Sequence, residues 1–120
     1  MADRAEIDRL LRDLYAARLR GDLDAVCGSF SGDARLQVAG ASRPSPLAIN
    51  ATGAREYRAL FNVMLKSFKV SDLTILSIII DGAKAAVHWR AKVYSRITGT
   101  TAPTELIDLV EVDDGGRITR

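Results

Sequence analysis

The hydrophobic pattern of this chain changes once, near residue 69, from a helical to a strand-like period. In residues 5–22 and 54–68 apolar side chains recur every three to four positions, whereas from residue 70 onward they alternate with polar ones. A segment with the helical period cannot bury its apolar side chains on one face of a strand, and a segment with the alternating period cannot bury them on one face of a helix. Helices followed by antiparallel strands therefore predict an α+β fold, with the helices on one face of a sheet.

Turn-forming residues divide the chain into its expected elements. Gly21 ends the first helix and Asp22 caps the second, while Pro44 and Pro46 break a loop over residues 41–53. We expect one domain, residues 1–120, because a chain of this length holds a single core. We expect helices at residues 5–22, 23–30 and 54–68, strands at 34–40, 70–81, 83–96 and 104–112, and a short final strand at 117–120.

Composition excludes several classes of function. Hydrophobic residues make up 48% and charged residues 27% of the chain, and the net charge is +2, so nothing points to disorder, nucleic acid or a membrane surface. The single cysteine, Cys27, can form no internal disulfide and has no partners for a metal site. The charged start MADRAEID lacks a signal-peptide core, and no apolar run is long enough to span a bilayer. We therefore expect a cytoplasmic protein without a metal or an organic cofactor.

The apolar segment TELIDLVEV carries one carboxylate in its middle, Asp108. Alternation gives this segment an acidic face and gives residues 83–96 a basic face. These two faces suit neighbouring strands, with Arg90 near Glu111 and Arg96 near Glu105. The opposite faces of both segments, which include Asp108, then point together toward the helices.

An ionised side chain that points into a core costs several kcal/mol unless it is paired or hydrogen-bonded. Asp108 is therefore either a pocket acid or ligand-binding group, or a structural carboxylate tied to Tyr15, Arg18 or backbone donors of the helices. Trp89, on the inward face of residues 83–96, serves equally well as core or as a pocket wall. Alternation puts His88, the only histidine, on the outer face, where a surface or interface role is favoured over catalysis.

A two-residue turn at the DG of residues 81–82 orients the preceding strand. This turn predicts that Thr74, Leu76, Ile78 and Ile80 face inward, and that Leu73, Ile75, Ser77 and Ile79 face outward. Large aliphatic side chains on an open sheet indicate either a partner subunit or coverage by the chain's own ends. We favour a homodimer through the outer sheet face, with Leu73, Ile75, Ile79 and His88 at the interface.

Four stretches stand out by their order and spacing along the chain: YAARLRGDLDAV, FSGDARLQV, TGAREYRALF and LIDLVEVDDGGRI. In this order and spacing they resemble the nuclear transport factor 2-like superfamily, which includes the SnoaL-like polyketide cyclases and the ketosteroid isomerases. The resemblance covers essentially the whole chain. It implies a cone, in which a strongly curved antiparallel (mixed) β-sheet wraps three helices and leaves a deep apolar pocket, usually in a dimer. Relatives usually continue beyond GRITR through a complete closing strand, so either that strand is very short here or the sequence is that of a truncated or partly ordered product.

By this resemblance, Asp108 corresponds to the aspartic acid that helps to form the oxyanion hole of ketosteroid isomerases. Val38 stands at the position of their general base, and Leu14 and Phe61 stand at those of their oxyanion-hole tyrosines, with Tyr15 adjacent. Without the base, an enzyme of that kind cannot abstract its proton, so ketosteroid isomerase activity is excluded.

The resemblance implies a protein that binds a small hydrophobic molecule. It further implies isomerase-, cyclase- or hydratase-type acid–base chemistry, with Asp108 as acid or hydrogen-bond donor. The alternative is a non-enzymatic, dimeric association or ligand-sensing module whose outer sheet face carries the function. We expect the pocket to be lined by Leu14, Tyr15, Arg18, Phe30, Val38, Phe61, Leu65, Trp89 and Asp108.

Overall fold

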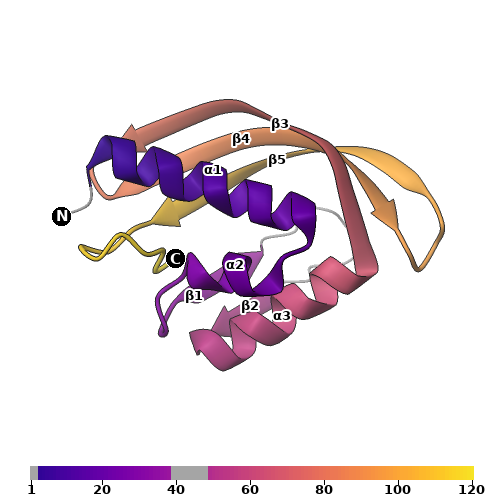
Figure 1. Cartoon of the computed structure of the whole chain (residues 1–120), viewed down its shortest axis with the longest axis horizontal. Helices are drawn as coiled ribbons and strands as arrows, with labels where there is room; N and C mark the ends of the chain where they lie inside the picture. Colours follow the sequence, from indigo (N-terminus) through magenta and orange to yellow (C-terminus); the bar gives the residue numbers. More distant parts are fainter. Residues whose placement is uncertain (1–2, 39–48) are drawn as a thin grey trace.

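Three helices and two antiparallel sheets form the protein, which we describe from a computed structural model for residues 3–38 and 49–120 (Figure 1). The expected α+β fold, with helical elements before the long strands, is confirmed. The helices are α1 (Arg4–Arg20), α2 (Leu23–Gly28) and α3 (Gly53–Ser67). The smaller sheet pairs β1 (Arg35–Val38) with β2 (Ile49–Thr52). The larger sheet has the order β3-β4-β5, with β3 (Phe68–Asp81), β4 (Lys84–Ser95) and β5 (Thr101–Glu111).

The larger sheet lies over α1, and α2 and α3 lie on the other side of that helix (Figure 1). Helix α3 passes directly into β3, since the helix ends at Ser67 and the strand begins at Phe68. The strands bend where they pass over the helices, but the sheet is not strongly curled. The strongly curved, cone-shaped sheet that the resemblance implied is therefore not what the described strands form. The helices are nevertheless gathered on one face of the larger sheet, as expected.

Side-chain caps fix the ends of the first two helices. Asp3 precedes α1 and accepts a hydrogen bond from the backbone N–H of Glu6 at 2.8 Å. Asp22 accepts one from the backbone N–H of Ala25 at 3.1 Å, at the start of α2. Gly21 ends α1 in the left-handed conformation, with φ of 72°, which glycine adopts without strain. The expected stop and cap are confirmed, and the tight turn between them packs α2 against α1.

Strands β4 and β5 pair in a register that differs from the expected one. Arg90 lies opposite Glu105 rather than Glu111, and the expected pair of Arg96 with Glu105 is wrong as well. The connection between the two strands is shorter than expected, because β5 begins at Thr101 rather than at residue 104. Pro103 lies within β5, an edge strand where proline is tolerated. The displacement along β5, from position 111 to 105, is six residues. Because six is an even number, every side chain keeps its expected face.

Strand β3 contains two irregularities that reverse its faces. Its register against β4 shifts between Ile75 and Ser77 and again between Ser71 and Thr74. Each shift inserts one residue, and each inserted residue changes the face on which the preceding side chains lie. Leu73 and Ile75 therefore pack against the core, so their expected outward orientation is wrong. Thr74, which we expected to face inward, is exposed.

The connection between the two sheets also departs from expectation. Residues 49–52, expected in a loop, form β2 and pair with β1. Residues 39–48 lie outside the described residues; they hold most of the expected proline-containing loop and the end of the strand expected at 34–40. The final strand expected at 117–120 is reduced to bridges of Ile118 with Phe30, which is parallel, and with Val112, which is antiparallel. Ile118 is fully buried, so this short segment completes the core.

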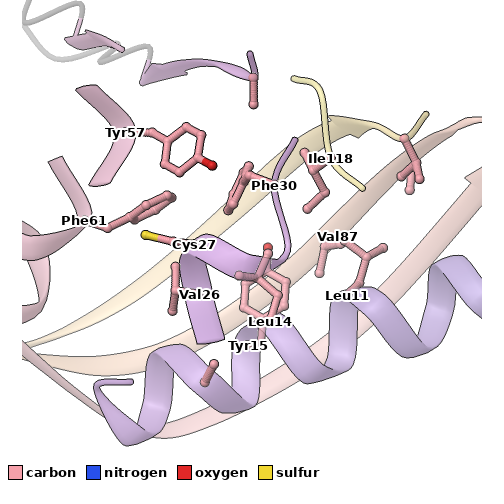
Figure 2. Close-up of a cluster of buried hydrophobic side chains, with 14 of the residues drawn as sticks. Leu11, Leu14, Tyr15, Val26, Cys27, Phe30, Tyr57, Phe61, Val87 and Ile118 are labelled. Carbon is pink, nitrogen blue, oxygen red and sulfur yellow. The ribbon is translucent and has the colours of Figure 1, made fainter. Parts of the chain in front are cut away.

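The core lies between the three helices and the inner face of the larger sheet (Figure 2). Phe30 stands in an aromatic group, with ring centroids 5.5 Å from Tyr57 and 5.2 Å from Phe61. Val87 and Trp89, both from β4, are among its most buried members. In the described part of the chain, no helix combines the length and the apolar character needed to cross a bilayer.

Candidate functional site

Asp108 lies where α1, β4 and β5 meet, and three side chains converge on its carboxylate. The Tyr15 hydroxyl and the Trp89 indole nitrogen both donate hydrogen bonds to Oδ2, the second at 2.9 Å. The guanidinium of Arg18 lies 3.7 Å from the same oxygen, close enough for an ion pair but too far for a hydrogen bond. Asp108 therefore points toward the helices, as alternation predicted, and Tyr15 and Arg18 are its neighbours.

The local geometry of the helix and the sheet explains this convergence. Tyr15 and Arg18 are three residues apart on α1, so they lie on one face of the helix about one turn apart. On the sheet, Asp108 is opposite Val87 in β4. Trp89 lies two residues further along β4 on the same face, so it is the diagonal neighbour of Asp108, within reach of a long side chain.

Both hydrogen bonds to Oδ2 have a fixed direction. The indole N–H of Trp89 can only donate. Burial, and next the charge of Asp108, raise the pKa of Tyr15, so its hydroxyl stays protonated and donates as well. Asp108 is therefore the acceptor in both bonds. Its Oδ1 takes part in no hydrogen bond with the described residues, and its side chain is 35% exposed.

Arg18 lies over two aromatic rings. Its guanidinium carbon is 5.1 Å from the ring centroid of Trp89 and 5.5 Å from that of Tyr15. Cation–π contacts of this kind hold the side chain beside Asp108. Arg18 donates no side-chain hydrogen bond to the described residues, although its side chain is only 19% exposed. Its N–H donors therefore remain available to water or to a ligand.

A cavity of about 200 Å³ lies beside this group, between the C-terminal half of α3 and the larger sheet. Its wall is apolar apart from Arg18 and Thr104. The lining consists of Arg18, Phe61, Met64, Leu65, Phe68, Val70, Trp89, Val93, Thr104 and Leu106. Arg18 and Trp89 thus belong both to the cavity wall and to the surroundings of the Asp108 carboxylate.

The cavity wall shares Arg18, Phe61, Leu65 and Trp89 with the lining that we expected. Tyr15 and Asp108 contact Arg18 and Trp89 but are not on the wall; Leu14 and Phe30 are packed in the core, and the side chain of Val38 lies outside the described part of the chain. The sequence reasoning missed Met64, Phe68, Val70, Val93, Thr104 and Leu106. Alternation had already turned Val93 and Leu106 inward, which was a usable signal. Unbroken alternation along β3 also turns Val70 inward, because the two single-residue shifts cancel at that position.

The other candidates from the sequence stand apart from this site. His88 is on the outer face of the sheet, where its Nε2 lies 3.0 Å from Oε1 of Glu105. Cys27 is buried in the core, as expected of a small apolar residue. Within residues 3–38 and 49–120, no group of three or more histidine, cysteine or carboxylate side chains is arranged to hold a metal ion.

Helices packed on one face of an antiparallel sheet, beside an apolar cavity with a polar group at its edge, form the fold of the nuclear transport factor 2-like proteins. The sequence pattern of the SnoaL-like domain matches residues 11–120, and the chain belongs to this family.

Solved structures of similar proteins agree with this fold. A LEH-like epoxide hydrolase from M. tuberculosis is 23% identical, with a TM-score of 0.75 over 96% of this chain and 78% of that one. A proposed isomerase from Bacillus subtilis is 19% identical, with a TM-score of 0.86 over 100% of this chain and 86% of that one. A proposed polyketide cyclase from Xanthomonas campestris is 19% identical, with a TM-score of 0.78 over 99% and 89%. At this identity the likeness establishes the fold alone. Comparison with curated proteins gives no match.

Proposed function

We propose that this SnoaL-like protein binds a small hydrophobic molecule in the cavity and that Asp108 acts on it as a proton acceptor. One observation carries the proposal: Arg18 and Trp89 line an apolar cavity and also contact the Asp108 carboxylate. An apolar cavity with a few convergent polar groups is typical of a ligand-binding site. Relatives described as an epoxide hydrolase, an isomerase and a polyketide cyclase support acid–base chemistry as the activity.

The reaction that we propose is isomerisation, cyclisation or hydration of a carbonyl-like compound. Tyr15 and Trp89 hold Oδ2 of Asp108, which leaves Oδ1 open to accept a proton. Arg18 carries a permanent positive charge and would stabilise negative charge that develops on a substrate oxygen. We had expected Asp108 to be an acid or hydrogen-bond donor, but both hydrogen bonds run toward it, so the acceptor role is the better proposal. Standard ketosteroid isomerase activity is not part of this proposal, because Val38 stands at the position of the base that those enzymes use.

Trp89 offers a direct test of ligand binding, because it is the only tryptophan and lies on the cavity wall. We expect titration with small cyclic ketones to change its fluorescence in a saturable manner. Val93→Phe fills the cavity with a ring and should abolish this response. Ile79→Phe adds the same ring on the outer face, where Ile79 is 65% exposed, and should leave the response unchanged. A fluorescence response that Val93→Phe keeps as fully as Ile79→Phe would mean that the ligand binds outside the cavity.

A second candidate function, association of two copies, is favoured by the outer face of the larger sheet. Ile79 and Leu109 lie in one row across the sheet, on either side of Ala86, and are 65% and 77% exposed. Ile107, on the same face, is 64% exposed. Exposed aliphatic side chains that gather on an open sheet are typical of a subunit interface. We therefore propose a homodimer through this face, as a non-enzymatic alternative or in addition to the ligand site.

The proposed interface differs from the one that the sequence predicted. Leu73 and Ile75 are no longer part of it, because they pack against the core, whereas Ile79 and His88 remain on the outer face. Sedimentation equilibrium at micromolar concentration should give the mass of a dimer, and Leu109→Asp should convert it to a monomer. Val63→Asp, at a position that is 60% exposed on α3, is the matched control and should leave the dimer intact. A wild-type monomer at that concentration would refute the interface.

A further inference from the structure

We propose that the molecule bound in the cavity is a small carboxylate whose hydrocarbon part is about the size of one substituted ring. The apolar wall would hold the hydrocarbon, and Arg18 would bind the carboxylate group. This inference rests on the proposed ligand site and adds the size and the charge of the ligand.

The volume of the cavity limits the size of the hydrocarbon. The cavity measures about 200 Å³, and an engineered apolar cavity of about 150 Å³ is known to bind benzene. One ring with a short substituent therefore fits, whereas a skeleton of three or four fused rings does not. Among the described residues of the wall, Thr104 is the only other polar one, so the part of the ligand that the wall contacts must be largely apolar.

Among the described residues, Arg18 is the only charged one on the wall, and its N–H groups are available to a ligand. Asp108 does not use them, since its Oδ2 already accepts hydrogen bonds from Tyr15 and Trp89 while Arg18 stands 3.7 Å away. A guanidinium presents parallel N–H groups that match the two oxygens of a carboxylate. Because the rings of Tyr15 and Trp89 already hold the guanidinium, little side-chain freedom remains to be lost when a ligand binds.

The charge of the surrounding segments favours an anion in spite of the nearby carboxylate of Asp108. Residues 62–71 and 91–104 supply more than half of the cavity wall and contain no aspartate or glutamate. Their basic residues are Lys66, Lys69, Lys92 and Arg96. Among the ion pairs of the described residues, only Lys92 has a partner, Asp72, with Nζ–Oδ2 at 3.3 Å. Lys69 and Lys92 lie on the outer face of the sheet, so their charge acts on an anion in the cavity only at long range and adds weakly to the attraction of Arg18.

The test compares two ligands of the same shape and different charge, 3-phenylpropionate and 3-phenylpropanamide, by the fluorescence of Trp89. We expect the carboxylate to bind at least about tenfold more tightly than the amide at low ionic strength, because hydrogen bonds to charged groups are the stronger ones. The preference should shrink as salt is added, since part of it comes from exposed basic residues.

Variants assign the preference to Arg18. Arg18→Gln should lower the affinity for the carboxylate to that for the amide. Arg18→Lys keeps the positive charge but loses the parallel N–H groups of the guanidinium, so it should retain part of the preference for the carboxylate. Arg9→Gln removes the same charge from an exposed position on α1 and should retain all of it. Should Arg18→Gln fail to fold, Arg18→Lys and the comparison of the two ligands on wild-type protein still show whether Arg18 binds the carboxylate.

The outcomes separate this inference from the proposed function. Equal or tighter binding of the amide would overturn the anionic ligand and leave the apolar ligand site standing. A carboxylate preference that persists in Arg18→Gln would overturn the assignment to Arg18. Absence of binding by both ligands, and by the cyclic ketones, would overturn the ligand site together with this inference.

Discussion

Replacement of Asp108 with alanine removes the acceptor that Tyr15 and Trp89 share. Both donor residues are 2% exposed, so neither hydroxyl nor indole can turn to bulk water. A buried donor without an acceptor costs about 1–3 kcal/mol, which gives about 2–6 kcal/mol for the two donors. Because the Asp108 side chain is 35% exposed, water can enter the space that it leaves and satisfy part of this loss. We therefore expect Asp108→Ala to lower the free energy of unfolding by about 3 kcal/mol.

Asparagine in place of Asp108 tests the charge separately from the shape. The amide keeps one oxygen that can accept from both Tyr15 and Trp89, but it loses the charge that makes such bonds roughly twice as strong. The contact with Arg18 is long and partly exposed, and its loss adds at most about 1 kcal/mol. We expect Asp108→Asn to cost about 1–2 kcal/mol, less than the alanine variant.

Equilibrium unfolding in urea, followed by circular dichroism, measures both values. Asp8→Ala is the control, because it removes an exposed carboxylate that pairs with Arg12 on α1, and it should cost less than about 0.5 kcal/mol. An Asp108→Ala variant within about 0.5 kcal/mol of wild type would refute the reasoning from the two hydrogen bonds. Ligand affinity in Asp108→Asn then separates the roles: unchanged affinity makes Asp108 a structural tie, and altered affinity makes it part of the ligand site.

Further predictions concern the helix, a strand irregularity and the C-terminal segment. Burial and the charge of Asp108 raise the pKa of Tyr15 above its ordinary value of 10.0. Above about pH 10 the unfolded chain therefore loses the hydroxyl proton of Tyr15 before the folded protein does, and the free energy of unfolding of the wild type falls by up to about 1.4 kcal/mol per pH unit. Tyr15→Phe lacks this loss, and the unfolding free energies of the two proteins should converge between about pH 10 and pH 11. Asp72 has a φ of 50°, so Asp72→Val should cost about 1–2 kcal/mol in urea unfolding, whereas Asp72→Gly should cost nothing. Ile118→Ala should cost about 2–4 kcal/mol because Ile118 is fully buried, whereas Ile97→Ala, at a position 78% exposed, should stay within about 0.5 kcal/mol of wild type by thermal unfolding.

The inward and outward faces of β4 and β5 could be predicted from the sequence, because a register error by an even number of residues leaves every side chain on its predicted face. The pairing of Arg90 was wrong by six residues, yet Trp89 and Asp108 still face the helices as predicted. The faces of β3 could not be predicted in the same way. Single inserted residues leave no clear mark on an apolar segment, and the one between Ile75 and Ser77 moved Leu73 and Ile75 from the outer face to the core.

The candidate site was predictable where local spacing determines it. Tyr15 and Arg18 share a helix face, and Asp108 shares a sheet face with Trp89, so their contact follows from periodicity once the helix packs on the sheet. The position of the cavity was not predictable, because it depends on how α3 passes into β3 and which side chains fill the space beside it. Phe30, which we expected on the wall, packs in the core against Tyr57 and Phe61, whereas Phe68 lines the cavity.

The claim that the cavity beside Asp108 is the ligand site is tested most directly by the indole N–H signal of Trp89 in a two-dimensional ¹H–¹⁵N NMR spectrum. As the only tryptophan, Trp89 gives one such signal, and this N–H donates to Asp108 while the side chain lines the cavity. Addition of 3-phenylpropionate is predicted to shift the signal until the site is saturated. A signal that stays in place while the amides of Ile79 and Leu109 move would put the ligand on the outer face and contradict the account.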